Sequence, residues 1–186
     1  MRSIFLPVLL FAFSIVKAQL KADFNMDKTG GCSPLSISFT NSTTGASSNA
    51  TYQWDFGNGN TSVLQNAGAV YYEEKTFTIK LTVKDGSQTS SQTKTITVYK
   101  TPVVDFTFLP NNGCLPMPVN FTSSSSAGDG TISSYYWDFG DGFVQQSLTP
   151  TISHTYGIKQ TATVSLTASN TYGCSNTITK QNIIKV

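Results

Sequence analysis

The amino-acid sequence predicts an all-β protein that consists of two tandem antiparallel β-sandwich domains. Three observations lead to this prediction: apolar and polar residues alternate with the period of a β-strand, clusters rich in glycine, asparagine and aspartate separate the alternating segments, and the same series of segments occurs twice. Short alternating strands bounded by turn residues are typical of two packed sheets. Outside the first 18 residues, no segment has the sustained period of an amphipathic helix.

The N-terminal segment has the pattern of a secretory signal peptide. A positively charged start, Met1-Arg2, precedes an apolar run over residues 4–16, and Val16-Lys17-Ala18 fits a signal peptidase site. A run of about 13 residues is too short for a membrane span, which needs about 20, so a retained anchor is the less favoured alternative. We therefore predict that residues 1–18 are removed, that the mature chain begins at Gln19, and that the protein is secreted without membrane insertion.

The composition limits the partners and the compartment. Arg2 and Lys17 account for two of the 12 Lys and Arg residues, so the mature chain carries 10 basic residues against 10 acidic ones. A neutral chain without a basic run is a poor match for nucleic acid or anionic lipid. Three cysteines in an exported chain indicate an oxidising compartment, with one disulfide and one remaining thiol.

An internal repeat divides the chain into two domains. The paired segments are separated by 82 residues at the start of each copy, 83 at a tryptophan motif, 85 in the following strand and 88 in the last strand. The matched pairs are Asp23-Phe24 with Asp105-Phe106, Gly31-Cys32 with Gly113-Cys114, Trp54–Gly57 with Trp137–Gly140, Ile79 with Val164, and Ile96 with Ile184. Because the separation grows only between matched segments, the insertions fall in surface loops. We predict domains at residues 19–102, which include a short Thr101-Pro102 linker, and at residues 103–186.

Each matched segment alternates in the manner of a strand with one buried face. The residues expected to face inward are Leu35, Ile37, Phe39, Tyr52, Trp54, Phe56, Phe77, Ile79, Leu81 and Val83 in the first domain, and Tyr135, Trp137, Phe139, Ala162, Val164, Leu166 and Ala168 in the second. Turn-forming clusters such as Gly57–Asn60, Asp85-Gly86 and Gly140–Gly142 separate these strands. A proline in so short a linker limits the swing of the two domains, so we expect a short rod.

The motif Trp-Asp-Phe-Gly-(Asn/Asp)-Gly occurs once in each domain. Its residues are Trp54, Asp55, Phe56, Gly57 and Gly59 in the first copy and Trp137, Asp138, Phe139, Gly140 and Gly142 in the second. The tryptophan and phenylalanine share one strand face and are expected to fill the core, the aspartate can accept backbone N–H groups of the following turn, and the glycines permit positive φ. An exposed indole that stacks on a sugar is the alternative, and the alternating apolar row argues against it.

This motif, with its flanking residues, resembles the signature of the PKD (polycystic kidney disease) domain. The flanks are an early proline, a tyrosine before the next strand (Tyr72 and Tyr156), and an alternating strand that ends in Leu-Thr-Val or a variant. The second copy also keeps His154 in a His-x-Tyr element, which the first copy lacks. The resemblance implies an immunoglobulin-like sandwich that acts outside the cell in adhesion, in ligand binding or as a spacer beside catalytic domains. The Gly-Cys-x-Pro and late Gly-Cys elements further resemble the PKD repeats of large surface proteins in gliding Gram-negative bacteria.

No constellation in the sequence supports catalysis, a cofactor or a metal. His154 is the only histidine, no nucleophile-elbow glycine pattern surrounds a serine, and zinc would need further His or Cys ligands. Asp129, Asp138 and Asp141 could contribute oxygens to Ca²⁺, but Ca²⁺ needs about six to eight of them and the dense series of a dedicated loop is missing. We therefore expect no enzyme activity, no cofactor and no metal site.

For the cysteines, we predict a Cys114–Cys174 disulfide within the second domain and a free Cys32. Cys174 has no counterpart in the first domain, where Ser87 occupies about the same place. The bridge would close a loop of about 60 residues, which is worth about 4 kcal/mol in the chain-entropy estimate. A Cys32–Cys114 bridge is disfavoured because it would join the equivalent poles of two domains in tandem.

These observations predict a non-catalytic extracellular module for structural support or adhesion. Because the sequence stops at Val186, at the end of a strand, we expect it to be the N-terminal part of a longer surface protein. Its partners would be other surface proteins or extracellular polysaccharide, and its oligomeric state stays open. The alternative is an accessory polysaccharide- or collagen-binding module, or a spacer, of a secreted hydrolase, which requires an exposed aromatic patch.

Overall fold

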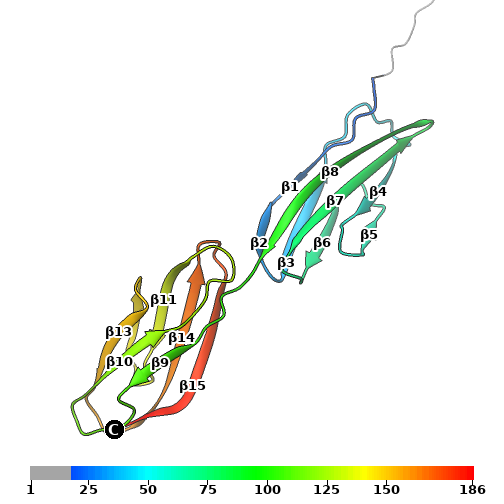
Figure 1. The fold of residues 1–186 in the computed structure, drawn as a ribbon. Helices are drawn as coiled ribbons and strands as arrows, with labels where there is room; N and C mark the ends of the chain where they lie inside the picture. The colour runs from blue at the N-terminus through cyan, green and yellow to red at the C-terminus, as the bar shows by residue number, and fades with distance from the viewer. Residues whose placement is uncertain (1–17) are drawn as a thin grey trace, which may run out of the picture.

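The computed structural model describes residues 18–186, so the predicted signal peptide lies outside the described residues except for Ala18. Within this range the chain forms 15 β-strands and no helix, arranged in two sandwiches that follow one another along the chain (Figure 1). The described part of the chain thus contains no helix long and apolar enough to cross a membrane. The prediction of two tandem immunoglobulin-like antiparallel sandwiches is confirmed.

The first sandwich consists of two sheets with the strand orders β1-β3-β6 and β2-β8-β7-β4-β5. The strands are β1 (Phe24–Met26), β2 (Gly30–Cys32), β3 (Leu35–Asn41), β4 (Thr51–Asp55), β5 (Thr61–Ser62), β6 (Ala67–Tyr71), β7 (Thr76–Asp85) and β8 (Gln88–Tyr99). Neighbours are antiparallel except β2 and β8, which run parallel and place Cys32 opposite Tyr99. Cys32 therefore lies at the end of the domain from which the linker leaves.

The second sandwich repeats this plan with the sheets β13-β10-β9 and β12-β11-β14-β15. The strands are β9 (Phe106–Leu109), β10 (Met117–Ser123), β11 (Ile132–Asp138), β12 (Val144–Ser147), β13 (Thr151–Tyr156), β14 (Thr161–Asn170) and β15 (Ser175–Lys185). The parallel pairing of β2 with β8 has a reduced counterpart here, a single parallel bridge between Asn112 and Lys185. The two domains are thus structural as well as sequence repeats.

Alternating residues fill a separate core in each sandwich. In β7 the four apolar residues between Phe77 and Val83 are buried, and the polar residues between them point outward. At the centre of each core, the indole of Trp54 or Trp137 is fully buried and meets a phenylalanine ring edge-on. Neither indole face is open to a sugar, so these side chains pack the core, as the alternating pattern indicated.

The predicted disulfide pairing is wrong. Cys174 is bonded to Cys32 of the first domain, with 5.4 Å between their Cα atoms, and Cys114 is free and exposed. Cys114 lies beside Lys185, because the N–H of Gly113 donates to the carbonyl oxygen of Lys185 at 3.3 Å. Strand β15 has 11 residues, and at about 3.3 Å each they separate that end of the domain from the hairpin with Cys174 by about 35 Å. The hairpin instead faces the first domain.

The linker between the domains is held from both sides. The N–H of Lys100 donates to Oδ2 of Asp129 in the second domain at 2.8 Å. The N–H of Thr101 donates to Oε1 of Glu74 in the first domain at 3.1 Å. Each domain therefore supplies a carboxylate that fixes the linker backbone.

The hairpin between β14 and β15 supplies further contacts between the domains. These contacts and those of the linker together form the joint. The ring of Tyr172 lies parallel to that of Tyr99, with 3.8 Å between the centroids. The side chain of Asn170 donates from Nδ2 to the carbonyl oxygen of Lys100 at 3.0 Å and accepts at Oδ1 from the N–H of Cys174 at 3.0 Å. Together with the disulfide, these contacts join the two sandwiches end to end (Figure 1).

Candidate functional site

The signature motifs form two turns of the same geometry. Oδ1 of Asp55 accepts a hydrogen bond from the N–H of Gly57 at 2.9 Å, and Oδ1 of Asp138 accepts one from the N–H of Gly140 at 2.9 Å. Both glycines have positive φ, 71° and 76°. A Cβ atom on either glycine would lie 2.5 Å or less from a backbone carbonyl oxygen of the adjacent strand. The aspartate and the glycine therefore stabilise a turn.

A buried tyrosine fastens each turn to the opposite sheet. The hydroxyl of Tyr71 donates to the carbonyl oxygen of Phe56 at 3.1 Å, and that of Tyr156 donates to the carbonyl oxygen of Phe139 at 3.0 Å. Burial, with a smaller effect of the Asp55 carboxylate, raises the pKa of Tyr71 to about 12. Burial, with smaller effects of two nearby carboxylates, also raises the pKa of Tyr156. Both phenols are neutral donors at physiological pH.

Tyr71, and not the predicted Tyr72, is the counterpart of Tyr156. Leu35 pairs in register with Tyr71 in the same way that Met117 pairs with Tyr156. Tyr72 lies beyond the end of β6 and is largely exposed. Two adjacent tyrosines fit the family pattern equally well, but successive side chains of a strand point to opposite faces, so only one can reach the turn.

His154 belongs to the second signature turn. Its Nε2 lies 2.7 Å from Oδ2 of Asp141, and both side chains are largely buried. The imidazole lies parallel to the ring of Phe139, with 4.1 Å between the centroids, and Tyr156 meets it edge-on at 4.7 Å. Oδ1 of Asp141 also accepts from the N–H of Phe143 at 3.1 Å. The histidine therefore connects the turn to strand β13 of the same domain.

The three aspartates considered for Ca²⁺ have separate structural contacts. Asp138 accepts from its own turn, Asp141 meets His154, and Asp129 accepts the N–H of Lys100 in the joint. Within residues 18–186, no group of three or more His, Cys, Asp or Glu side chains is placed to hold a metal ion.

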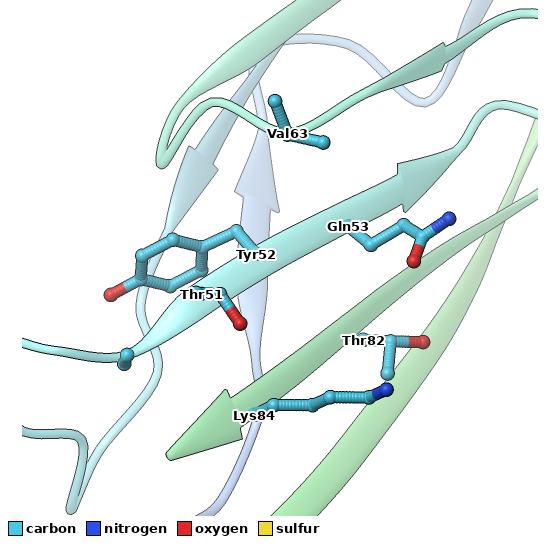
Figure 2. A pocket seen from close by; sticks show the side chains of 7 residues that line it. Thr51, Tyr52, Gln53, Val63, Thr82 and Lys84 are labelled. Atoms are coloured by element: carbon cyan, nitrogen blue, oxygen red, sulfur yellow. The ribbon is translucent and has the colours of Figure 1, made fainter. Parts of the chain in front are cut away.

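A groove of about 500 Å³ lies on the outer face of the first domain. Figure 2 shows Thr51 and Gln53 on β4, Thr82 and Lys84 on the neighbouring β7, and Val63 on the segment that follows β5. Gln53 pairs with Thr82 and Thr51 pairs with Lys84 in the antiparallel register. The four polar side chains therefore form one patch on the floor of the groove.

The polar groups of this groove are available to a ligand. In the described part of the chain, the side chains of Thr51, Gln53, Thr82 and Lys84 take part in no hydrogen bond or ion pair. Val63, which is 76% exposed, adds an aliphatic wall. An ammonium, an amide and two hydroxyls beside an apolar wall can bind sugar hydroxyls or the carbonyl groups of an extended peptide. The groove lacks the paired acid and base that hydrolysis would require.

The same face of the second domain presents an aromatic ring. Tyr136 is the counterpart of Gln53; it pairs with Gln146 on β12 and Thr167 on β14, and is 47% exposed. A half-exposed tyrosine on a polar sheet face offers a stacking surface for a sugar ring. The alternating sequence pattern indicates the orientation of this ring. Tyr135 and Trp137 face inward, so Tyr136 between them must point outward.

Fold and turns together define a tandem of immunoglobulin-like β-sandwich modules whose signature residues are structural. The PKD domain family matches residues 21–100 and again residues 99–186, which together cover nearly the whole described chain. The chain belongs to the PKD domain family, as its signature motifs indicated.

Several known proteins are similar to parts of this chain. Collagenase ColA of Bacillus cereus is 47% identical over 53 residues, which is 27% of this chain and 5% of the collagenase. The PKD1 domain of Vibrio anguillarum Epp is 30% identical with a TM-score of 0.40, over 47% of this chain and 98% of that domain. The PKD1 domain of the Vibrio cholerae metalloprotease PrtV is 26% identical with a TM-score of 0.40, over 47% of this chain and 100% of that domain. The matched part of this chain thus spans about a twentieth of the length of that collagenase.

Proposed function

We propose that this chain is a non-catalytic extracellular module in which two stiffly joined sandwiches, residues 19–102 and 103–186, form a structural or adhesive part of a surface protein. The observation that carries this proposal is the joint. A disulfide, a tyrosine stack and two carboxylate contacts all hold one short connection. Such a joint supports a role in which the distance and direction between attached parts matter.

The location outside the cell is supported by the disulfide and by the signal-like N-terminus. A disulfide between domains persists in an oxidising compartment. The proposal is tested by expressing the full sequence in a Gram-negative host and analysing the exported protein by mass spectrometry. We expect a chain that begins at Gln19 and contains the Cys32–Cys174 bond. Retention of residues 1–18 in a reduced cytoplasmic protein would contradict the proposal.

The non-catalytic role is supported by the way the shared family residues are used. Tryptophans fill the cores, aspartates cap the turns, and the single histidine meets an aspartate of the same turn. We therefore expect partners to bind on the outer sheet faces. There the groove offers unpaired polar groups and Tyr136 offers an aromatic ring.

A second candidate function is an accessory polysaccharide- or collagen-binding module, or a spacer, of a secreted hydrolase. It is favoured by the groove with Lys84 and by the exposed ring of Tyr136. Named relatives that carry the module, a collagenase and a metalloprotease, also support it.

Pull-down on insoluble collagen and chitin, together with a glycan array, separates the two functions. If the accessory function holds, the Gln53→Ala/Lys84→Ala double variant or Tyr136→Ala weakens binding at least tenfold. Lys159→Ala removes an exposed charge outside both faces and serves as the charge-matched control. No binding to any of these polymers leaves the structural role and removes the accessory one.

A further inference from the structure

The free cysteine of the second domain occupies the place that the bonded cysteine has in the first. Gly31-Cys32 and Gly113-Cys114 are matched segments of the repeat. Cys32 lies beside the last residues of β8, through the parallel pairing of β2, and Cys114 lies beside the last residues of β15, through the Asn112–Lys185 bridge. Each cysteine therefore stands at the end of its own domain where the last strand ends, which we call the exit end.

Cys32 is bonded to Cys174 in the hairpin between β14 and β15, the last hairpin of the domain that follows it. Cys174 follows Gly173 in the turn between β14 and β15, and its side chain is almost completely buried against the first domain. The exit end of the first domain is therefore a receptor for a Gly-Cys hairpin, covalently closed by Cys32.

At three matched positions, the exit end of the second domain has exposed apolar side chains where that of the first domain has polar ones. Leu109, Leu115 and Ile158 are 75%, 45% and 62% exposed. Strand pairing brings them to one end, since Leu109 ends β9 opposite Asn120, and Met117 pairs with Tyr156, two residues before Ile158. The matching positions of the first domain hold Asp27, Ser33 and Glu73. Apolar side chains at these three positions are suited to cover by another domain.

We propose that this end receives a further module of the same family, whose late hairpin carries a Gly-Cys pair that forms a disulfide with Cys114. The equivalent bond already exists in this chain, which makes the partner a third sandwich and not a small thiol or a second copy of this chain. Two thiols are consumed, and their two electrons and two protons pass to a disulfide oxidant of the export compartment, which is reduced to two thiols. This inference does not depend on any ligand of the outer faces.

The first test uses the protein as its own cells export it. Thiols are blocked with iodoacetamide at low pH, the protein is digested without reduction, and the peptide that holds Cys114 is identified by mass spectrometry. We expect Cys114 joined to a cysteine that follows glycine in another PKD-type sequence. Recovery of alkylated Cys114 beside an intact Cys32–Cys174 bond, a Cys114–Cys114 dimer, or a mixed disulfide with a small thiol would each overturn the proposal.

A second test supplies the partner from this chain. A copy of Tyr99–Val186 is added directly after Val186, so that the copy follows the second domain as the second follows the first. We expect Cys114 bonded to Cys174 of the added copy, and Cys114 of the added copy alkylated. The Cys114→Ser variant of the extended protein shows by hydrogen exchange whether the added copy folds without the bond. A folded copy with no bond to Cys114, or a copy that cannot fold in this position, counts against the proposal.

Discussion

Nε2 of His154 lies 2.7 Å from Oδ2 of Asp141, and this contact closes the second signature turn from the side of the other sheet. The first domain builds the same turn differently. Ala69 stands at the position of His154, and Asn58, the counterpart of Asp141, donates from Nδ2 to the carbonyl oxygen of Val70 at 3.2 Å. One repeat thus uses an aspartate and a histidine where the other uses a single amide.

Replacing His154 by alanine is expected to destabilise the second domain by about 1–3 kcal/mol. The change leaves a largely buried carboxylate oxygen of Asp141 without its partner, and an unsatisfied buried acceptor costs about that much. Hydrogen exchange of amides in β10–β14 measures the loss separately from the first domain. Thr155→Ala, on the outer face of the same strand, is the control; equal losses in the two variants would contradict the role given to His154.

The two glycines of the second turn are expected to tolerate alanine very differently. Gly140 and Gly142 both have positive φ, which costs alanine about 1–2 kcal/mol. A Cβ on Gly140 would also lie 2.1 Å from the carbonyl oxygen of Thr163, whereas a Cβ on Gly142 meets nothing within 4 Å. Thermal unfolding should show a much lower Tm for Gly140→Ala than for Gly142→Ala. Similar Tm values in the two variants would mean that the turn can move away from β14.

Tyr71 is expected to make the first domain sensitive to alkali. Its pKa in the folded domain is about 12, raised by burial from an ordinary value near 10. The folded state therefore favours the neutral phenol, so this contribution to stability is complete below pH 10 and is lost as the pH rises from 10 to 12.

Tyr71→Phe separates this effect from other alkaline titrations. At pH 7 the variant should be less stable by about 0.5–1.5 kcal/mol, because the hydrogen bond to Phe56 is gone. Between pH 10 and 12 the difference from the wild type should shrink and then reverse. Denaturant titrations at several pH values measure it, and a constant difference would refute the assignment.

Loss of the disulfide is expected to loosen the joint without unfolding either domain, because each domain has its own core. In Cys174→Ser, the ring stack of Tyr99 and Tyr172 still restrains the domains, and in Cys174→Ser/Tyr172→Ala it does not. ¹⁵N relaxation should give the wild type one rotational correlation time, and the double variant shorter times for each domain. Cys114→Ser should behave as the wild type, and an unchanged correlation time in the double variant would show that the carboxylate contacts suffice.

The strands and cores were predictable because they depend on local alternation. Tyr52, Trp54 and Phe56 face the core for the same reason that makes Gln53 and Asp55 face outward. The choice between Tyr71 and Tyr72 was wrong because it depends on strand register, which is set by pairing with β3 and is not visible in the segment itself.

The joint could not be read from the two repeats separately. Its contacts involve Glu74, Tyr99, Asp129, Asn170 and Tyr172, which lie in different segments and meet only when one domain is placed after the other. A signal existed in Cys174, which occurs in only one copy. A residue that serves its own domain core is expected in both copies, so a cysteine found in one copy only is a candidate for a contact outside its own domain.

The bond between Cys32 and Cys174 spans 142 positions and closes a covalent ring that contains most of both sandwiches. If the chain is pulled at Gln19 and Val186, tension crosses from one sulfur to the other, and residues 33–173 cannot be drawn out even when their sheets separate. About 25 residues lie outside the ring, and at about 3.5 Å each they limit the fully drawn-out length of these segments to about 90 Å. The disulfide therefore caps the length to which the chain can be drawn out between these two residues, whatever becomes of the sheets inside the ring.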